Sequence, residues 1–299
     1  ITHRLNEIMA LADRVTVLRD GKLAGTLTRQ EITADRMINM MVGRELTNVY
    51  PKREVPIGDV VLKVEDLSSN ELLKGISFEV RKGEILGIGG LVGSRRTEML
   101  ETLFGLRPIT AGKIYLNGKE LNPKNPRHVI QNHIAFVTED RKKNGLVLCL
   151  PVHENINMVN VQRPSFAGYL NWPKLKDNAN RHRKTLNIRL SKIEQIVSSL
   201  SGGNQQKVAL AKWLDFAPQV IIFDEPTRGI DIGAKTEIYS IMGELAARGT
   251  AILMVSSELP ELISVADRIL VMQEGRMKGI VEKHEMTQGR VMSLATQKT

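Results

Sequence analysis

The fold is decided by Leu200-Ser201-Gly202-Gly203-Asn204-Gln205-Gln206-Lys207, a polar turn that runs directly into the apolar segment 208–214. Ser201 is a residue type that caps helices, so the pattern predicts that a helix begins here. Gly202 and Gly203 let a ligand approach the backbone closely, and the free N–H groups of a helix N-terminus favour an anion. The stretch therefore predicts a phosphate-binding turn, although an ordinary capped helix is the alternative for an isolated Ser-Gly-Gly.

A second stretch gives the first one its context. It reads Val220-Ile221-Ile222-Phe223-Asp224-Glu225-Pro226, a short apolar strand that ends in two carboxylates. At the carboxyl edge of a parallel sheet, such carboxylates hold magnesium and orient the attacking water of a nucleotide hydrolase. In this order and at this spacing the two stretches resemble the ATP-binding subunits of ABC transporters. The resemblance implies that Ser201, Gly202, Gly203 and Gln205 belong to the signature motif, that Asp224 is a magnesium ligand and that Glu225 is the catalytic glutamate.

Upstream, an apolar strand at 84–89 leads into a loop at 90–97 and a helix at 98–104. Strand, glycine loop and helix are the context that a P-loop requires, and a plain turn between strand and helix is the alternative. Gly90 and Thr97 match the motif, whereas Arg95 replaces a glycine and Arg96 replaces the lysine, whose compact ammonium a planar guanidinium does not reproduce. The resemblance implies that ATP contacts the loop and that Thr97 joins Asp224 on Mg²⁺; the implied nucleotide-binding residues of the loop are Gly90, Gly93, Ser94, Arg95, Arg96 and Thr97.

The family can be narrowed from three segments, 138–141, 200–207 and 224–235. Together they resemble the second half of the tandem ATPases that drive monosaccharide importers of the ribose, galactose and xylose type. The resemblance covers nearly the whole chain. It implies an α/β P-loop nucleoside triphosphate hydrolase with a mainly parallel core sheet, peripheral antiparallel strands and a helical insert at about 141–215. It also implies nucleotide contacts from Asp231 and from Glu139, which stands where the family usually has a glutamine.

The N-terminal segment repeats later in the chain. Shifted by 254 positions, residues 1–25 match a later segment without gaps, with identities at Leu5, Glu7, Ala12, Asp13, Arg14, Val17, Gly21 and Gly25. A gap-free repeat of this length indicates duplicated domains. We therefore expect residues 1–44 to be the C-terminal end of a first ATPase domain, 45–58 to be a linker rich in breakers, and 59–299 to be a second domain. On this expectation the chain is a fragment whose first domain is largely missing.

The repeat bears on the chemistry through His3 and Ser257, which align with each other. In the family, two nucleotide domains face head to tail, and an imidazole at this place contacts the γ-phosphate. The resemblance makes His3 catalytic, whereas a serine has no comparable charge. Since Arg95, Arg96, Glu139 and Ser257 all depart from the family pattern in one site, we expect that site to bind ATP weakly or to hydrolyse it poorly. The competent site would combine His3 and the signature 201–205 with a P-loop outside this chain.

Composition sets the remaining limits. The 299 residues, 42% of them apolar, can bury a sizeable core. No apolar run approaches the roughly 20 residues of a membrane span, and there is no signal-peptide pattern, so we expect a cytoplasmic protein on the inner face of the membrane. The lone Cys149 allows no intramolecular disulfide.

The net charge of +9 permits an anionic partner without selecting one, so a soluble ABC ATPase acting on ribosomes or nucleic acid is the alternative function. The linker of about a dozen residues is short, and the basic residues of 174–192 are explained by a solvated helical face. We therefore expect no nucleic acid. The expected partners are the first domain of the same protein, membrane permease subunits and, indirectly, a periplasmic or extracellular sugar-binding protein.

Overall fold

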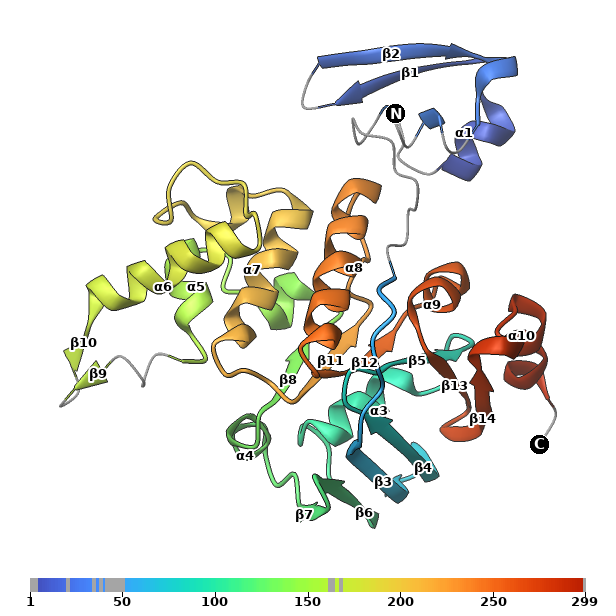
Figure 1. Cartoon of the computed structure of the whole chain (residues 1–299), viewed down its shortest axis with the longest axis vertical. Coiled ribbons are helices and arrows are strands. Elements are labelled where there is room, and N and C mark those ends of the chain that lie inside the picture. Colours follow the sequence, from blue (N-terminus) through green and yellow to red (C-terminus); the bar gives the residue numbers. More distant parts are fainter. Residues whose placement is uncertain are drawn as a thin grey trace.

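The structure, a computed structural model, describes residues 5–19, 22–33, 36–37, 40, 52–160, 165–166 and 169–297. Figure 1 shows the first of these segments as a helix and a hairpin, and the remainder as two sheets with helices packed around them. His3 and residues 45–51 of the expected linker lie outside the described residues. None of the helices in the described part of the chain has both the length and the apolar character that a membrane span requires.

The core sheet has six strands in the order β14-β13-β5-β12-β11-β8. Its members are β5 (Ile85–Gly90), β8 (Ile134–Val137), β11 (Val220–Asp224), β12 (Ala251–Val255), β13 (Arg268–Gln273) and β14 (Arg276–Glu282). All neighbours pair in parallel except β13 with β14. Every residue of β8, β11 and β12 is buried, as expected for parallel strands covered on both faces. The predicted parallel core is confirmed, and its carboxyl edge carries the ends of β5, β8, β11 and β12.

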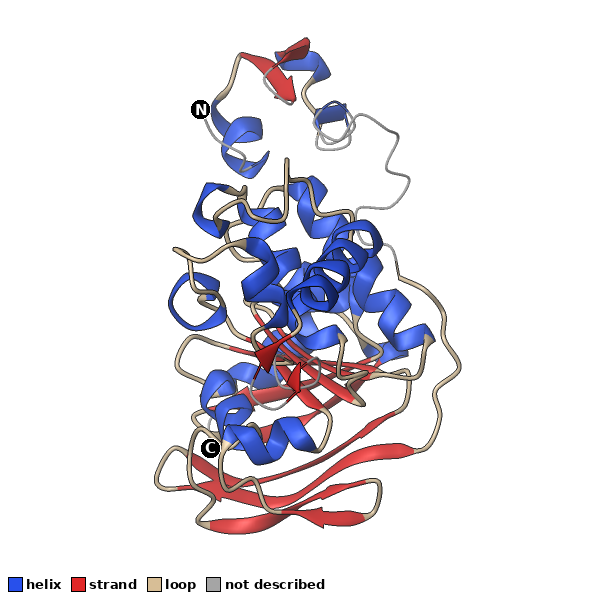
Figure 2. Cartoon of the chain, turned by 90° about the vertical axis from the view of Figure 1, so that its left-hand side faces the viewer, coloured by secondary structure: helices blue, strands red, loops and turns tan. Residues whose placement is uncertain are grey.

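A second sheet of four antiparallel strands has the order β4-β3-β6-β7. It consists of β3 (Val60–Ser69), β4 (Leu73–Arg81), β6 (Ala111–Leu116) and β7 (Lys119–Leu121). Figure 2 shows the two sheets as separate layers, with most helices on the side of the core sheet that faces away from the antiparallel strands. One apolar cluster includes side chains of both sheets, so they share a core. The peripheral antiparallel strands are thus also confirmed.

The helices around the core sheet are α3 (Arg96–Leu103), α4 (Pro126–Gln131), α8 (Ile232–Ala247), α9 (Leu259–Val265) and α10 (Gln288–Thr296). The insert forms the lobe on the left of Figure 1 and has a smaller apolar cluster of its own. It contains the π-helix η2 (Arg141–Gly145), α5 (Val152–Asn157), the short strands β9 (Ser165–Phe166) and β10 (Tyr169–Leu170), α6 (Trp172–Thr185), the 3₁₀ turn η3 (Val197–Ser199) and α7 (Gly202–Leu214). The segment 141–215 is therefore mainly helical, as predicted.

The sequence repeat is also a structural repeat. The elements α1 (Leu5–Leu11), β1 (Arg14–Arg19), β2 (Lys22–Thr28) and η1 (Arg29–Glu31) have the same bounds as α9, β13, β14 and η4 (Lys283–Glu285) after a shift of 254. Both hairpins bulge at the same step, between Val17 and Leu18 and between Val271 and Met272.

A contact between these elements repeats as well. Arg29 Nη1 donates to the carbonyl oxygens of Met9 and Ala12 at 2.7 and 2.9 Å. At the positions 254 residues later, Lys283 Nζ donates to the carbonyl oxygens of Ile263 and Ala266 at 3.1 and 3.2 Å. In both copies, a basic side chain that follows the hairpin thus bonds to the end of the helix that precedes it, although one is an arginine and the other a lysine.

The described part of the expected linker packs against the body that follows it. Lys52 Nζ lies 2.6 Å from Asp267 Oδ1 and donates to Ala266 O, and Gly58 N donates to Lys82 O. Residues 52–58 have no regular secondary structure, in agreement with their breakers. Before the linker, the Thr33 hydroxyl accepts a hydrogen bond from Arg36 N at 3.3 Å.

Candidate nucleotide-binding site

The loop between β5 and α3 has the backbone of a phosphate-binding loop. Gly90 has a φ of +154°, and a Cβ there would lie 2.4 Å from Met272 O, so only glycine fits. At Gly93 an added Cβ would meet nothing within 4 Å, which leaves the outer side of the loop open. Ser94 is buried, and its Oγ has no hydrogen-bond partner among the described residues. The N–H groups at the start of α3 follow directly, where a phosphate is favoured.

Arg95 keeps this loop geometry in spite of replacing glycine. Its φ of +71° and ψ of +29° lie in the left-handed region, which costs a residue with a Cβ about 1–2 kcal/mol. Its guanidinium Nη1 lies 2.7 Å from Oε1 of Glu98, three residues later in the sequence, and the two groups form an ion pair. The predicted mismatch therefore produces backbone strain and leaves the turn folded.

Arg96, the first residue of α3, turns toward the end of β12. Its Nη1 donates to Ser256 O at 3.0 Å. Burial lowers the pKa of Arg96, while the neighbouring carboxylates of Glu225 and Asp224 act in the opposite direction. The guanidinium thus lies near both carboxylates and is held by a backbone carbonyl.

Asp224 and Thr97 fit a magnesium ion. Asp224 ends β11, is 1% exposed and has a buried Oδ1 without a hydrogen-bond partner among the described residues. Burial raises the pKa of Asp224 to about 6, against the lowering effect of a hydrogen bond with Thr97. Carboxylate oxygens are ligands that Mg²⁺ prefers, and the Thr97 hydroxyl beside it matches the P-loop ligand of such sites.

Glu225 follows with a left-handed backbone, at a φ of +47°. Its N–H donates to Val255 O at 3.1 Å, which ties it to the end of the neighbouring strand β12. Ser257 Oγ donates to Glu225 Oε2 at 3.0 Å. Ser257, which aligns with His3 in the repeat, therefore contacts the predicted catalytic glutamate.

Glu139 lies two residues after β8, at the same edge of the sheet. It forms an ion pair with Arg228, from the loop that follows β11. Arg141 Nη1 donates to the carbonyl oxygen of Arg228 at 3.0 Å, and its Nη2 donates to Gly229 O at 3.4 Å. The loop after the two carboxylates is thus held from the start of the helical insert. Arg141 is the last residue of the segment 138–141, and the sequence predicted no contact for it.

The predicted signature residues lie at the start of α7. Ser201 caps this helix, and its Oγ accepts from the side-chain Nδ2 of Asn204 at 2.9 Å. A Cβ on Gly202 would lie 2.8 Å from Arg141 Nη2, and one on Gly203 would lie 2.5 Å from Ala234 Cβ. Gly203 is therefore needed for close packing against α8, whereas at Gly202 the closest atom belongs to the movable end of the Arg141 side chain.

Two residues predicted to contact the nucleotide use their side chains for hydrogen bonds to backbone groups of the protein. Gln205 is 5% exposed, and its Nε2 donates to the carbonyl oxygens of Val197 and Leu200 at 3.2 Å, so the side chain lies beneath the turn. Asp231 caps α8 by accepting from Ala234 N at 2.9 Å. A direct nucleotide contact by either residue stays a prediction.

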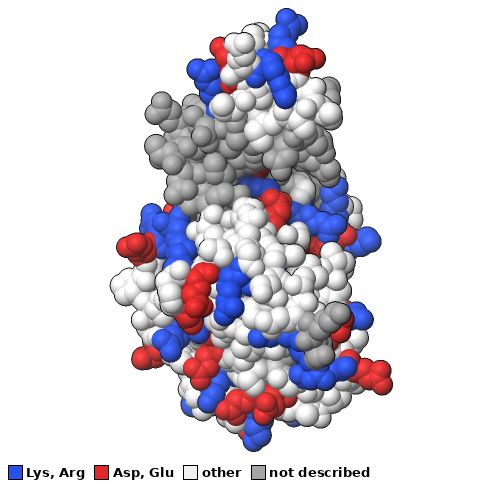
Figure 3. Space-filling view, turned by 90° about the vertical axis from the view of Figure 1, so that its right-hand side faces the viewer, with Lys and Arg blue, Asp and Glu red and all other residues white. Residues whose placement is uncertain are grey.

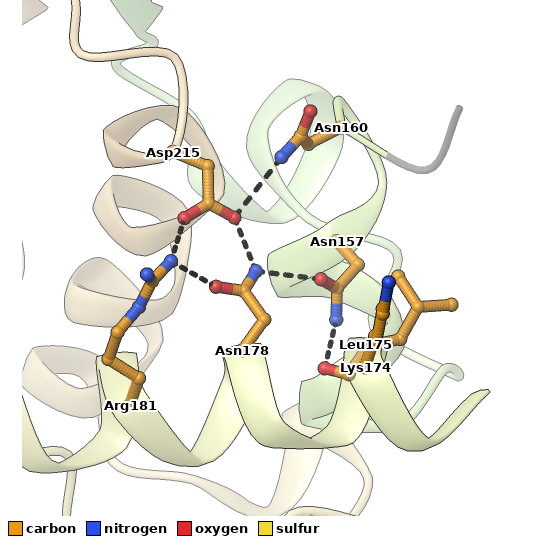
Figure 4. A pocket seen from close by; sticks show the side chains of 7 residues that line it. All are labelled: Asn157, Asn160, Lys174, Leu175, Asn178, Arg181 and Asp215. Carbon is orange, nitrogen blue, oxygen red and sulfur yellow. Dashed lines mark hydrogen bonds and ion pairs between the residues drawn. The ribbon is translucent and has the colours of Figure 1, made fainter. Parts of the chain in front are cut away.

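A polar cluster fixes the far end of the signature helix (Figure 4). Asp215, directly after α7, accepts from Arg181 Nη2 at 2.6 Å, from His182 Nε2 at 2.8 Å and from Asn178 of α6. Burial raises the pKa of Asp215, but His182 and hydrogen bonds from Asn178 and Asn160 have the larger opposite effect and lower the pKa below its usual value. The cluster borders a cleft of about 280 Å³, whose lining residues are Asn157, Asn160, Lys174, Leu175, Asn178, Arg181 and Asp215. Because most polar side chains there bond to one another, the hydrogen bonds of the cluster connect α6 to the end of α7.

The sequence pattern of the family described as "ABC transporter" matches residues 73–228, which include the loop 90–97 and both carboxylates. The chain belongs to the ABC transporter family. Ribose import ATP-binding proteins of Rubrobacter xylanophilus and Geobacillus kaustophilus are 47% and 45% identical to it over 99% of its length. The chain spans about three fifths of the length of these relatives, 59% and 60%.

Solved ABC structures agree in fold. An ATP-binding cassette of an ABC transporter matches with a TM-score of 0.69 at 20% identity, covering 80% of this chain and all of that one. A nucleotide-free ATP-binding cassette matches with a TM-score of 0.67 at 21% identity and the same coverage. At these identities the likeness establishes the ABC cassette fold alone.

Proposed function

We propose that the chain is part of the ATP-binding and ATP-hydrolysing subunit that energises import of a monosaccharide through a membrane permease. The observation that carries the proposal is the convergence of loop 90–97, Asp224 and Glu225 at one edge of the core sheet. The printed names of the relatives, which are ribose import proteins, supply the class of cargo. They also favour transport over action on ribosomes or nucleic acid.

In this chain's own P-loop site, backbone N–H groups at the start of α3 bind the phosphates. Thr97 and Asp224 would hold Mg²⁺, which when bound would supply positive charge to neutralise the phosphates. Glu225 orients the attacking water, and Ser257 holds one of its carboxylate oxygens. Arg96 contributes positive charge from a position fixed by Ser256.

Of the two nucleotide sites, this P-loop site binds ATP more weakly or hydrolyses it more slowly. Four residues that depart from the family pattern support this. Arg95 has a strained backbone, Arg96 bonds to a backbone carbonyl, Glu139 forms an ion pair with Arg228, and position 257 is a serine. The competent site combines signature residues 201–203 of this chain with the P-loop of a first nucleotide domain. His3 belongs to that site by its place in the repeat.

The proposed domain plan follows from the repeat: residues 1–44 close a first ATPase domain, 45–58 connect the domains, and 59–299 form the second. The partners are that first domain, permease subunits at the inner face of the cell membrane, and a sugar-binding protein acting through the permease. On the face shown in Figure 3, basic and acidic side chains are interspersed, so the charge of +9 does not form one basic field there.

Steady-state ATPase assays of the complete two-domain protein, assembled with its permease, test the proposal. Glu225→Gln is expected to retain most of the hydrolysis, whereas the same change in the corresponding glutamate of the first domain is expected to abolish it. The opposite dependence would show that the two sites are assigned the wrong way round. Salt-sensitive binding of RNA or DNA, without association with a permease, would contradict the transport function itself.

A further inference from the structure

A buried carboxylate outside the nucleotide site gathers three donors from three different elements. Glu261, the third residue of α9, is 0% exposed. Its Oε1 lies 2.6 Å from Lys235 Nζ of α8. Its Oε2 accepts from the hydroxyls of Thr227 and Ser256, at 2.8 and 2.9 Å. Burial raises the pKa of Glu261, but the ammonium of Lys235 and the two hydroxyls have the larger opposite effect. The pKa is therefore below its usual value, and the carboxylate is charged.

The two hydroxyl donors come from the loops that carry the site. Thr227 lies two residues after Glu225, and Ser256 directly precedes Ser257. Arg96 donates to the carbonyl oxygen of Ser256, and Ser257 donates to Glu225. Glu261 therefore holds the loop after β11 and the loop after β12 in register, and both contacts inside the nucleotide site depend on that register.

The internal repeat contains the same carboxylate. Glu7 follows His3 by four residues, as Glu261 follows Ser257 by four residues. The residue expected to face the γ-phosphate differs between the copies, whereas the glutamate does not.

We propose that Glu261 is a positioning residue of the nucleotide site, which aligns the Ser256–Ser257 loop with the loop of Glu225 so that both face the γ-phosphate. The inference rests on the proposed function, since it concerns the same P-loop site. A purely structural carboxylate would stabilise the fold without affecting the distinction between a triphosphate and a diphosphate.

The test measures the dissociation constants of the 299-residue chain for ADP and for a non-hydrolysable ATP analogue, each with Mg²⁺. Glu261→Gln is expected to weaken binding of the triphosphate about tenfold and binding of ADP less than about twofold, because the aligned loops face the γ-phosphate. Thr227→Ala and Ser256→Ala remove one neutral hydroxyl each, and they are expected to shift the same ratio in the same direction by a smaller factor.

Glu84→Gln is the matched control. Glu84 is also 0% exposed and charge-paired, with Arg268 Nε 2.6 Å from its Oε1, but it lies at the amino end of β5. This variant is expected to unfold at a lower denaturant concentration and to keep the ratio of the two constants. An unchanged ratio in Glu261→Gln, or in both hydroxyl variants if Glu261→Gln does not fold, overturns the inference alone. Failure of the unmodified chain to bind either nucleotide overturns the assignment of the loop 90–97 as a nucleotide site, and the inference with it.

Discussion

The strain at Arg95 yields a prediction with an unusual sign. Replacing Arg95 with either alanine or glycine removes its ion pair with Glu98, whose surface exposure and helical spacing make it worth about 0.3 kcal/mol. The two variants then differ only by a Cβ on a backbone with a φ of +71°. Glycine avoids about 1–2 kcal/mol of left-handed strain in the folded state. Its greater conformational entropy in the unfolded chain lowers the free energy of unfolding by about 0.4–1 kcal/mol.

The net expectation is that Arg95→Gly is more stable than Arg95→Ala by about 1 kcal/mol. Within an ordinary helix the order is reversed, since alanine exceeds glycine by about 1 kcal/mol. Urea denaturation of the two variants of this chain measures the difference from their midpoints at a common slope. A result in which the alanine variant equals or exceeds the glycine variant would refute the strained loop, and with it the physical reading of the altered P-loop.

Two further predictions concern stability elsewhere. Burial lowers the pKa of Lys212 to about 8, so below pH 8 the folded state bears a buried charge, and stability is expected to rise between about pH 8 and pH 10.5. Lys212→Met removes the charge along with its bond to Gly145 O. Denaturation of this variant across the same pH range should show a smaller increase of stability with pH than in the unmodified chain. An identical increase would contradict the burial of the charge. Gly203→Ala is expected to cost about 2 kcal/mol because its Cβ would overlap Ala234 Cβ. The helical control Gly289→Ala, with nothing within 4 Å of the added atom, should be neutral or stabilising, and equal thermal shifts in the two variants would argue against the overlap.

The parts of the site that sequence alone predicted are those encoded in short, contiguous patterns. Asp224 and Glu225 follow an apolar strand, and parallel strands place their carboxyl ends at one edge, so their position needed no tertiary information. The loop 90–97 was predictable for the same reason, including the glycine-like place of Arg95. The fold class followed from the same segments.

The parts that sequence reasoning missed depend on contacts between distant segments. Glu261 gains its importance only when α8, β11 and β12 bring three donors to it, although its counterpart Glu7 in the repeat was a visible signal. Gln205 belongs to a phosphate-binding motif in sequence, and yet its amide is used by backbone carbonyls beneath the turn. Periodicity reports which face of an element is apolar, but not which buried polar groups will meet.

The central claim is that the two nucleotide sites are unequal, and the aligned positions 3 and 257 test it most directly. In the complete two-domain protein, assembled with its permease, His3→Ala and Ser257→Ala each leave only a methyl side chain at equivalent positions 254 residues apart. Steady-state ATP hydrolysis is expected to fall by about a hundredfold or more in His3→Ala, in keeping with the loss of a group that contacts the reacting phosphate. It should change by less than about twofold in Ser257→Ala. Equal losses in both variants, or a greater loss in Ser257→Ala, would contradict the account.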